Sequence, residues 1–429
     1  MKKRRRSRLS VGTIVMLVLT ACVLAATAAF LFLIAGDGVY ERAYAAFNLL
    51  AETQKPTDAP SSEPTIKPLD TPMATAIPTA EPTAEPTPSP GLTTFTLAAA
   101  GTVYAPKAIR ESAQESGGHY DFLSVLNGIG DTLSAADLTI VTLETTTAGR
   151  EKGYGNYNTT PEILDALRAC GVDLVALATE RALDRGYDGL DLTLSELTSR
   201  SLAYAGVYPY SENGSATMMN INGVQVAVLA YSYGLSDEGK AQTKNDSRGV
   251  LALIDAQKMA QDITRARVDG ANVVIVLPHW GTKNRAETPE SVRVLANTLA
   301  QAGADVILGT HPNVAQGVER IHTVRSDGLT YETVVCYSLG CLLTDARSSE
   351  NTAGMAVNLT LVYDSNTRRA YPGEMKITPL YIASQRKDGK NVYRVVDAED
   401  EQALSKLTIA EQQSAAQAVL RVRQAVKGE

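Results

Sequence analysis

Two kinds of hydrophobic pattern alternate along the chain from about residue 94 to residue 397. Runs of four or more apolar residues bounded by turn residues are typical of strands buried on both faces. Stretches with helical spacing separate them, and this alternation indicates a layered α/β domain. The predicted strands are residues 95–100, 137–144, 172–178, 218–221, 224–230, 273–279, 305–309, 331–339, 355–363, 374–382 and 391–396, and the predicted helices are residues 161–170, 189–199, 255–268, 289–302 and 401–426.

Two of the predicted strands end in or lead directly to a histidine. His279 closes the apolar run 273–279, and His311 follows the run 305–309, although the whole chain has only four histidines. In α/β proteins the ends of such strands are where ligands and chemistry gather. We therefore take His279 and His311 as candidate catalytic or metal-binding residues at the rim of a sheet.

The N-terminus follows a different pattern. Residues 1–8 carry six lysines and arginines, and residues 9–36 contain no charged side chain. About 20 apolar residues suffice for a helix to cross a bilayer, and a basic cluster before it places the N-terminus in the cytoplasm. We predict a cytoplasmic tail, a single-pass signal-anchor over residues 9–36, and a body outside the cytoplasm. A cleaved signal peptide and lipidation at Cys22, which follows Leu19-Thr20-Ala21 as in a lipobox, are the alternatives.

Residues 37–93 separate this anchor from the body. Residues 51–91 contain ten of the 18 prolines, mixed with threonine, alanine, serine and glutamate. A segment of this composition cannot bury enough apolar area to fold, so we interpret it as a disordered stalk. The body is expected over residues 94–397, and a polar helix within residues 398–429 ends the chain.

Charge and cysteine content exclude several classes of function. The formal net charge is −7, and removing the six positive charges of the N-terminal cluster leaves −13 for the rest of the chain. Nucleic-acid binding needs a basic face, so this acidic body argues against a nucleic-acid partner. The four cysteines form no C-x-x-C pair, which is typical of neither a disulfide framework nor a zinc cage.

Six short motifs occur in the order in which the CapA family has them, the capsule or poly-γ-glutamate synthesis proteins. They are Gly101-Thr102, Thr142-Leu143-Glu144, residues 178–186, His279-Trp280-Gly281, residues 309–314 and residues 337–341. The chain resembles that family from about residue 95 to residue 396. The resemblance implies a metallophosphoesterase-like sandwich of mixed β-sheets flanked by helices. It also implies a bacterial cell-surface protein that makes, attaches or handles an anionic polymer, with that polymer or the envelope synthesis machinery as its partner.

The chain departs from the family's motifs at several positions that the resemblance implies are metal ligands. The family has aspartate at Thr102, asparagine at Glu180, and histidine at Arg181, Thr310 and Asn313. Such sites hold one or two divalent metals, and two metals can activate a water and clamp a phosphoryl-type centre. Arginine has no acceptor lone pair and stays protonated, so Arg181 cannot be a ligand.

Two hypotheses about the metal follow. In the first, the site is dead, and Arg181 occupies the place of the metal and pairs with Glu144, Glu180 or Asp184. In the second, one divalent metal, zinc or manganese, remains. It is held by Glu144 and the two strand-end histidines, with Glu180 or Asp184 as a further carboxylate.

The resemblance assigns other candidate roles. Asp184 is a catalytic candidate beside the two histidines, and the candidate ligand-binding residues are Trp280, Arg181, Asn313 and Tyr231. Two of these have structural alternatives, because Asp184 with Gly186 could shape a turn and Trp280 could cover a strand end. The leading functional hypothesis is a polymer-handling protein with weakened or lost metal-dependent catalysis. The alternatives are an active metal-dependent hydrolase with a reduced ligand set and a scaffold of an envelope synthesis complex.

Overall fold

The computed structural model describes the body of the chain. The described residues are 91–155, 157–208, 216–244, 250–325, 327–387 and 389–427. The predicted cytoplasmic tail and signal-anchor, and almost all of the predicted stalk, lie outside them. Within these ranges, no helix combines the length and the apolar character needed to cross a membrane.

Strand β1 (Leu92–Val103) lies at the centre of the first sheet. It pairs in parallel with β2 (Leu138–Leu143) and antiparallel with β12 (Ala353–Asp364). The eight strands have the order β14-β13-β12-β1-β2-β3-β4, and β11 pairs with β1 in parallel. The other strands are β3 (Leu174–Ala176), β4 (Ala203–Ala205), β11 (Cys341–Leu343), β13 (Arg369–Lys387) and β14 (Lys390–Asp397). Strands β1 to β4 run in parallel, so their carboxyl ends meet at one edge.

The second sheet has six strands in the order β5-β6-β7-β8-β10-β9. Its four central strands are parallel, and the two edge strands run antiparallel to their neighbours. The strands are β5 (Thr217–Ile221), β6 (Val224–Ser232), β7 (Val273–His279), β8 (Val306–Leu308), β9 (Val318–Val324) and β10 (Thr330–Cys336). The predicted hairpin at Asn222-Gly223 is confirmed, and both residues have the positive φ that such a two-residue turn needs.

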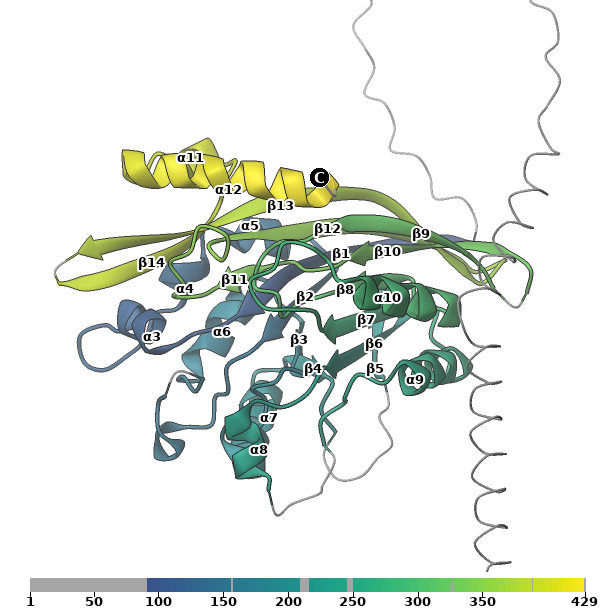
Figure 1. Cartoon of the computed structure of the whole chain (residues 1–429), viewed down its shortest axis with the longest axis horizontal. Coiled ribbons are helices and arrows are strands. Elements are labelled where there is room, and N and C mark those ends of the chain that lie inside the picture. Colours follow the sequence, from purple (N-terminus) through teal and green to yellow (C-terminus); the bar gives the residue numbers. More distant parts are fainter. Residues whose placement is uncertain are drawn as a thin grey trace, which may run out of the picture. The chain divides into compact units, whose positions relative to one another are not determined.

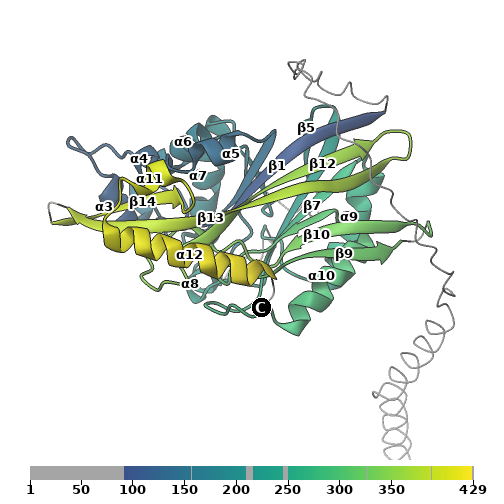
Figure 2. The same ribbon diagram turned by 90° about the horizontal axis from the view of Figure 1, so that it is seen from above.

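The two sheets face each other, and helices cover their outer faces (Figures 1 and 2). Along β1, Phe95, Leu97 and Ala99 pack against the second sheet, whereas Ala98 and Ala100 pack against helices. The first sheet is covered by α3 (Lys107–Ala113), α4 (Leu123–Leu126), α5 (Gly130–Ser134), α6 (Glu162–Ala169) and α7 (Gly186–Ser199), and the second by α9 (Ala256–Val268) and α10 (Glu290–Ala302). The predicted layered α/β sandwich of mixed sheets flanked by helices is confirmed.

The C-terminal segment differs from the prediction of one continuous helix. It forms α11 (Glu401–Leu404) and α12 (Ile409–Lys427), and α12 lies across β13 in Figure 2. The break follows from a capping box, because the Thr408 N–H donates to Glu411 Oε2 at 3.0 Å and the Glu411 N–H to Thr408 Oγ1 at 3.3 Å. This reciprocal pair satisfies free donors and starts a new helix.

Close contact between β1 and the turn before β11 leaves no room for a side chain at Gly101. A Cβ there would lie 2.0 Å from the carbonyl oxygen of Gly340. We expect Gly101→Ala to lower the free energy of unfolding by about 1–3 kcal/mol, which is the typical cost of overpacking a close contact. Denaturant titration measures this. Gly234→Ala is the matched control, because its Cβ would meet no atom within 4 Å. Equal unfolding midpoints for both variants would contradict the close contact.

Candidate functional site

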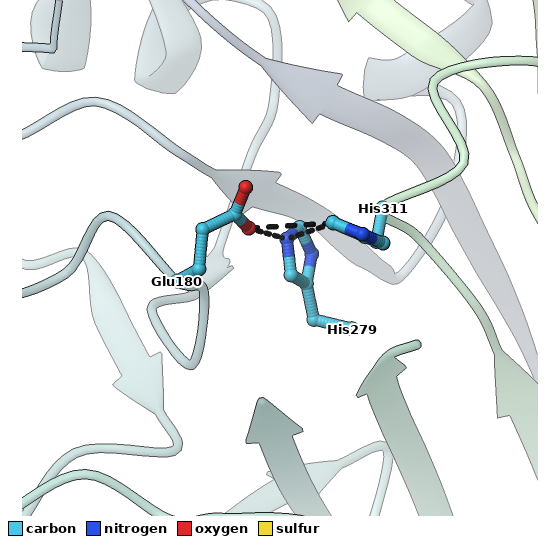
Figure 3. Close-up of side chains that lie close together, drawn as sticks. All are labelled: Glu180, His279 and His311. Atoms are coloured by element: carbon cyan, nitrogen blue, oxygen red, sulfur yellow. Dashed lines mark hydrogen bonds and ion pairs between the residues drawn. The ribbon is translucent and has the colours of Figure 1, made fainter. Parts of the chain in front are cut away.

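The carboxyl ends of three strands bring together the residues we call the Glu–His–His group: Glu180, His279 and His311. His279 is the last residue of β7, and His311 follows β8, its parallel neighbour. Glu180 comes from the turn after β3 in the other sheet. The three side chains point toward one another (Figure 3). The group therefore lies where the edges of the two sheets meet.

Backbone hydrogen bonds hold the turns after β7 and β8 against each other. The Trp280 N–H donates to the Thr310 carbonyl at 3.0 Å, and the Asn284 N–H donates to the Pro312 carbonyl at 2.8 Å. His311 has a φ of 98°, a region that residues other than glycine rarely adopt. Such a backbone costs on the order of 1–3 kcal/mol and clusters at functional sites. This turn thus fixes the imidazole of His311 beside His279.

Three potential ligand atoms of the Glu–His–His group converge on one point. Glu180 Oε2 lies 2.5 Å from His279 Nε2 and 3.4 Å from His311 Nδ1. The two ring nitrogens are 3.3 Å apart. The other ring nitrogen of His279, Nδ1, lies 3.0 Å from Thr310 Oγ1, which fixes the orientation of the ring. All three side chains are buried, so few other groups compete for these atoms.

The Glu–His–His group fits a single divalent ion. Ligands about 2.1 Å from a tetrahedral zinc are roughly 3.4 Å apart. Two of the three separations, 3.3 and 3.4 Å, match this geometry. The third, between Glu180 and His279, is 2.5 Å and must open by roughly 1 Å. Two imidazole nitrogens and one carboxylate oxygen suit zinc or manganese.

Lys283 fills the space on the other side of Glu180. Its ammonium nitrogen lies 2.6 Å from Glu180 Oε1 and 3.8 Å from Glu144 Oε1. Glu144 directly follows β2, and both carboxylates are almost completely buried. In a two-metal site, positive charge between such groups comes from metal ions. Here the chain supplies this charge itself, and Glu144 lies beside Lys283 instead of joining the Glu–His–His group.

Burial and neighbouring charges shift the pKa values of these groups. Burial raises the pKa of Glu144 to about 8, and the charge of Glu180 adds to this effect. Burial alone would raise the pKa of Glu180, but hydrogen bonds from His279 and His311 outweigh this effect and lower its pKa. Burial lowers the pKa of His279 despite the opposing carboxylate. These directions describe an ionised Glu180 that accepts a hydrogen bond from a neutral His279.

Arg181 does not take the position of a metal between the two histidines. Its Nη1 lies 3.3 Å from Asp184 Oδ2, and its guanidinium lies 3.9 Å above the centre of the Tyr157 ring. No hydrogen bond or ion pair connects it to either histidine within the described ranges. The predicted pairing of Arg181 with Asp184 is thus present, and Arg181 Nε also lies 4.0 Å from Glu180 Oε1, but the cation between the carboxylates Glu144 and Glu180 is Lys283.

Asp184 lies in a structural network instead of at the Glu–His–His group. Besides Arg181, it accepts a hydrogen bond from the hydroxyl of Ser236. Ser236 is the N-cap of α8 (Asp237–Gln242), where its oxygen accepts from the Gly239 N–H. Asp184 therefore connects the turn after β3 to the start of α8. This placement supports the turn-shaping alternative for Asp184 over the catalytic role.

Two predicted ligand-binding residues are buried on the outer side of the second sheet. Trp280 is 2% exposed, and its indole N–H donates to the Tyr337 carbonyl at 2.9 Å. Tyr231 is 1% exposed, and its hydroxyl donates to Asp262 in α9 at 3.0 Å. Both belong to the core under α9 and α10. Neither side chain is placed to contact a ligand at the Glu–His–His group, because each packs into the core under α9 and α10.

Asn313 lies beside the Glu–His–His group but makes its contacts through the backbone. Its carbonyl oxygen accepts from the side-chain amide of Asn351 at 3.1 Å. Its own side-chain oxygen is buried without a hydrogen-bond partner among the described residues, and the same holds for the hydroxyl of Thr102. Asn313 and Thr102 occupy positions where the CapA family has a histidine and an aspartate.

Sequence reasoning missed two residues of the site. Lys283 lies four positions after His279, in the same turn, so the signal was a basic residue close to the predicted ligand. Tyr233 follows β6, and its ring centre lies 4.4 Å from that of His311. It is 51% exposed and covers the group from the solvent side. The candidate ligand-binding residue was Tyr231, whereas Tyr233 is the tyrosine that reaches the site.

The fold and the site place this protein in the class of layered α/β proteins that carry a buried Glu–His–His group at the ends of their strands. Residues 96–346, more than half of the chain, match the family described as bacterial capsule synthesis protein PGA_cap. The chain belongs to this family, so the predicted CapA resemblance is confirmed.

Curated relatives carry related names. The chain is 28% identical over 229 residues to the PGA biosynthesis protein CapA of Bacillus subtilis (53% of this chain, 55% of the relative). It is 27% identical over 188 residues to the capsule biosynthesis protein CapA of Bacillus anthracis (43% of each). A probable polyglutamine synthesis accessory protein of Mycobacterium tuberculosis is 30% identical over 190 residues (41% of this chain, 50% of the relative). The matches thus span about half the length of these relatives.

Solved structures show weaker similarity. A phosphatase of Mycoplasma pneumoniae has a TM-score of 0.39 at 14% identity, with 75% of this chain and 99% of that chain covered. The calcineurin-like phosphoesterase YfkN of Bacillus subtilis has a TM-score of 0.37 at 13% identity, with 78% and 97% covered. Similarity at this level supports no conclusion about the activity of this chain.

Removing the ammonium group of Lys283 should destabilise the site. We expect Lys283→Met to lower the free energy of unfolding by about 1–3 kcal/mol, because two buried carboxylates lose their cation. This is less than for a fully buried pair, since the Lys283 side chain is 35% exposed. At a pH above 8, where Glu144 is ionised, adding Glu144→Gln should recover part of the loss, because it removes one of the two negative charges.

Denaturant unfolding of both single variants and the double variant measures this coupling. Lys240→Met is the matched control, because the Lys240–Asp237 pair is exposed and should change stability by at most about 0.5 kcal/mol. Strictly additive effects of Lys283→Met and Glu144→Gln would contradict the assigned interaction.

Proposed function

We propose that this chain is an accessory protein for a capsule or poly-γ-glutamate-type surface polymer, anchored in a bacterial cell membrane with its body outside the cytoplasm. Membership of the PGA_cap family supports the polymer. The uncharged residues 9–36 after a basic cluster support the anchor, and the proline-rich residues 51–91 support a spacer. The body then acts on, or holds, polymer at a distance from the membrane.

The same proposal holds that two-metal hydrolysis has been lost. The observation that carries it is the ammonium group of Lys283 next to Glu180 and Glu144. A fixed cation in this space repels a second divalent ion and already neutralises the carboxylates. Thr102 and Asn313 add no charged ligand, and Arg181 adds a further positive charge nearby. The role that remains is binding the polymer or a partner in the envelope synthesis machinery.

A one-metal hydrolase is the alternative that a specific observation favours. Glu180, His279 and His311 form a group of three ligand atoms within 4.8 Å of one another. When bound, a zinc or manganese ion supplies Lewis acidity and lowers the pKa of a bound water. Lys283 and Arg181 would then hold an anionic substrate next to the group. A purely structural scaffold is the third possibility, and the anchor and the stalk support it.

The non-catalytic role predicts that His279 is dispensable for polymer production. We expect cells that lack the chain to lose surface polymer and His279→Ala to restore it to nearly the wild-type amount. Polymer is quantified on the cell surface, and immunoblotting confirms equal protein levels. His322→Ala is the matched control, since the His322 side chain is 62% exposed. Failure of His279→Ala at normal protein level, with His322→Ala active, would support the hydrolase instead.

Metal content tests the number of ions directly. We expect the full-length chain, equilibrated with zinc or manganese and then dialysed, to retain at most one ion per chain, because the Glu–His–His group is the one such cluster of ligands among the described residues. His279→Ala and Glu180→Gln should each remove that ion, and His322→Ala should not. Elemental analysis against protein concentration gives the ratio. Two ions per wild-type chain would contradict the loss of the two-metal site, and no retained ion would exclude the one-metal hydrolase.

A further inference from the structure

A polar groove rich in arginine lies outside the Glu–His–His group. It has a volume of about 540 Å³, within the range of ligand pockets. We call it the arginine groove, and its polar lining includes Arg347, Arg386, Arg421, Ser384, Asn391 and Gln417. The three arginines come from the loop between β11 and β12, from β13, and from α12. Folding thus brings together cations that lie far apart in the sequence.

None of the three arginines forms a close ion pair in the part of the chain that the structure describes, although the charges of Asp345 and Glu350 act on Arg347 and Arg421 from a longer distance. No ion pair within 4.0 Å and no side-chain hydrogen bond involves Arg347, Arg386 or Arg421, and no aspartate or glutamate lines the groove. Some arginines outside the groove are paired, as Arg200 is with Asp165 and Arg267 with Asp305. In an acidic protein, three unpaired guanidinium groups in one groove favour an anionic ligand.

The groups in the groove suit carboxylates in particular. Guanidinium groups bind carboxylates with two parallel hydrogen bonds, and three of them can bind successive carboxylates of a polymer. Ser384, Asn391 and Gln417 offer neutral hydrogen-bonding groups between the cations. The buried rings of Tyr381 and Tyr393 also line the groove. The groove therefore has the chemistry to hold a flexible chain of repeated carboxylates.

A second cavity shares Arg421 with the arginine groove but has a different charge. Its volume is about 590 Å³, and its lining contains Glu287 and Glu350 as well as Arg293 and Arg421. Two carboxylates next to two guanidinium groups leave little net charge there. The arginine groove contributes Arg347 and Arg386 without a carboxylate in its lining, and it shares Arg421 with the second cavity.

The loop that carries Arg347 is connected to the turns of the Glu–His–His group. The side-chain amide of Asn351, in the same loop, donates to Asn284 Oδ1 at 2.9 Å and to the Asn313 carbonyl at 3.1 Å. Asn284 directly follows Lys283, and Asn313 lies two residues after His311. The arginine groove is therefore held in a fixed relation to the Glu–His–His group by one loop.

We propose that the arginine groove is a binding site for a carboxylate-rich polymer segment, a run of glutamyl units, separate from the Glu–His–His group. The identity of the polymer rests on the proposed function, whereas the site rests on the three unpaired arginines. The groove holds the polymer while the Glu–His–His group remains free. Binding is then independent of whether that group holds a metal.

Binding of a fluorescently labelled γ-linked glutamate oligomer to the full-length chain tests this proposal. We expect the triple variant Arg347→Gln, Arg386→Gln, Arg421→Gln to raise the dissociation constant at least about tenfold, because three charge-assisted contacts are lost. The matched control is Arg150→Gln, Arg168→Gln, Arg368→Gln, which removes the same charge from three exposed arginines outside the groove. This control should stay within about twofold of wild type, because it loses only long-range attraction.

The outcomes separate this proposal from the proposed function. Thermal unfolding of both triple variants close to wild type shows that the changes act on binding. Tight wild-type binding that the two triple variants weaken equally, or not at all, would overturn the groove but leave the polymer role standing. Wild-type protein that binds no oligomer would overturn both. Inorganic polyphosphate that competes more strongly than the glutamate oligomer would overturn the assigned ligand class.

Discussion

The site depends on Glu180, whose two carboxylate oxygens are engaged in different ways. One oxygen lies against His279 and His311, and the other binds the ammonium group of Lys283. A buried carboxylate is costly unless it is paired and hydrogen-bonded. The surrounding structure meets that requirement, because the end of β7 and the turns after β7 and β8 bring His279, Lys283 and His311 to Glu180. The strand ends are therefore arranged so that they supply the partners of the Glu180 carboxylate.

A lysine between two carboxylates has different chemistry from a divalent metal in the same place. A divalent ion accepts several ligands, whereas an ammonium group donates three hydrogen bonds and cannot lower the pKa of a water to neutrality. Lys283 keeps Glu144 and Glu180 close together, so the strand ends retain their arrangement. The cation belongs to the turn after β7, so it is covalently part of the chain.

The sequence predicted the framework more reliably than the details of the site. His279 and His311 were predicted together because buried parallel strands and their ends leave a clear apolar pattern. Helices α3 to α5 were missed, since they are short and follow no long amphipathic repeat. The break before α12 was visible as Thr408 and Glu411 at capping-box spacing, but the polar composition suggested one helix. Local pairs of this kind decide where elements begin, while periodicity decides only that they exist.

The identity of the cation at the site could not follow from sequence alone. Arg181 and Lys283 both lie near predicted ligands in the chain, and both could neutralise carboxylates. Their placement depends on packing: Arg181 lies over the Tyr157 ring beside Asp184, which leaves the position between Glu144 and Glu180 to Lys283. Packing also distinguishes Tyr231 from Tyr233. Strand β6 ends between these two residues, and of the two it is Tyr233 that contacts His311. Where a strand ends thus decides which of two similar side chains reaches the site.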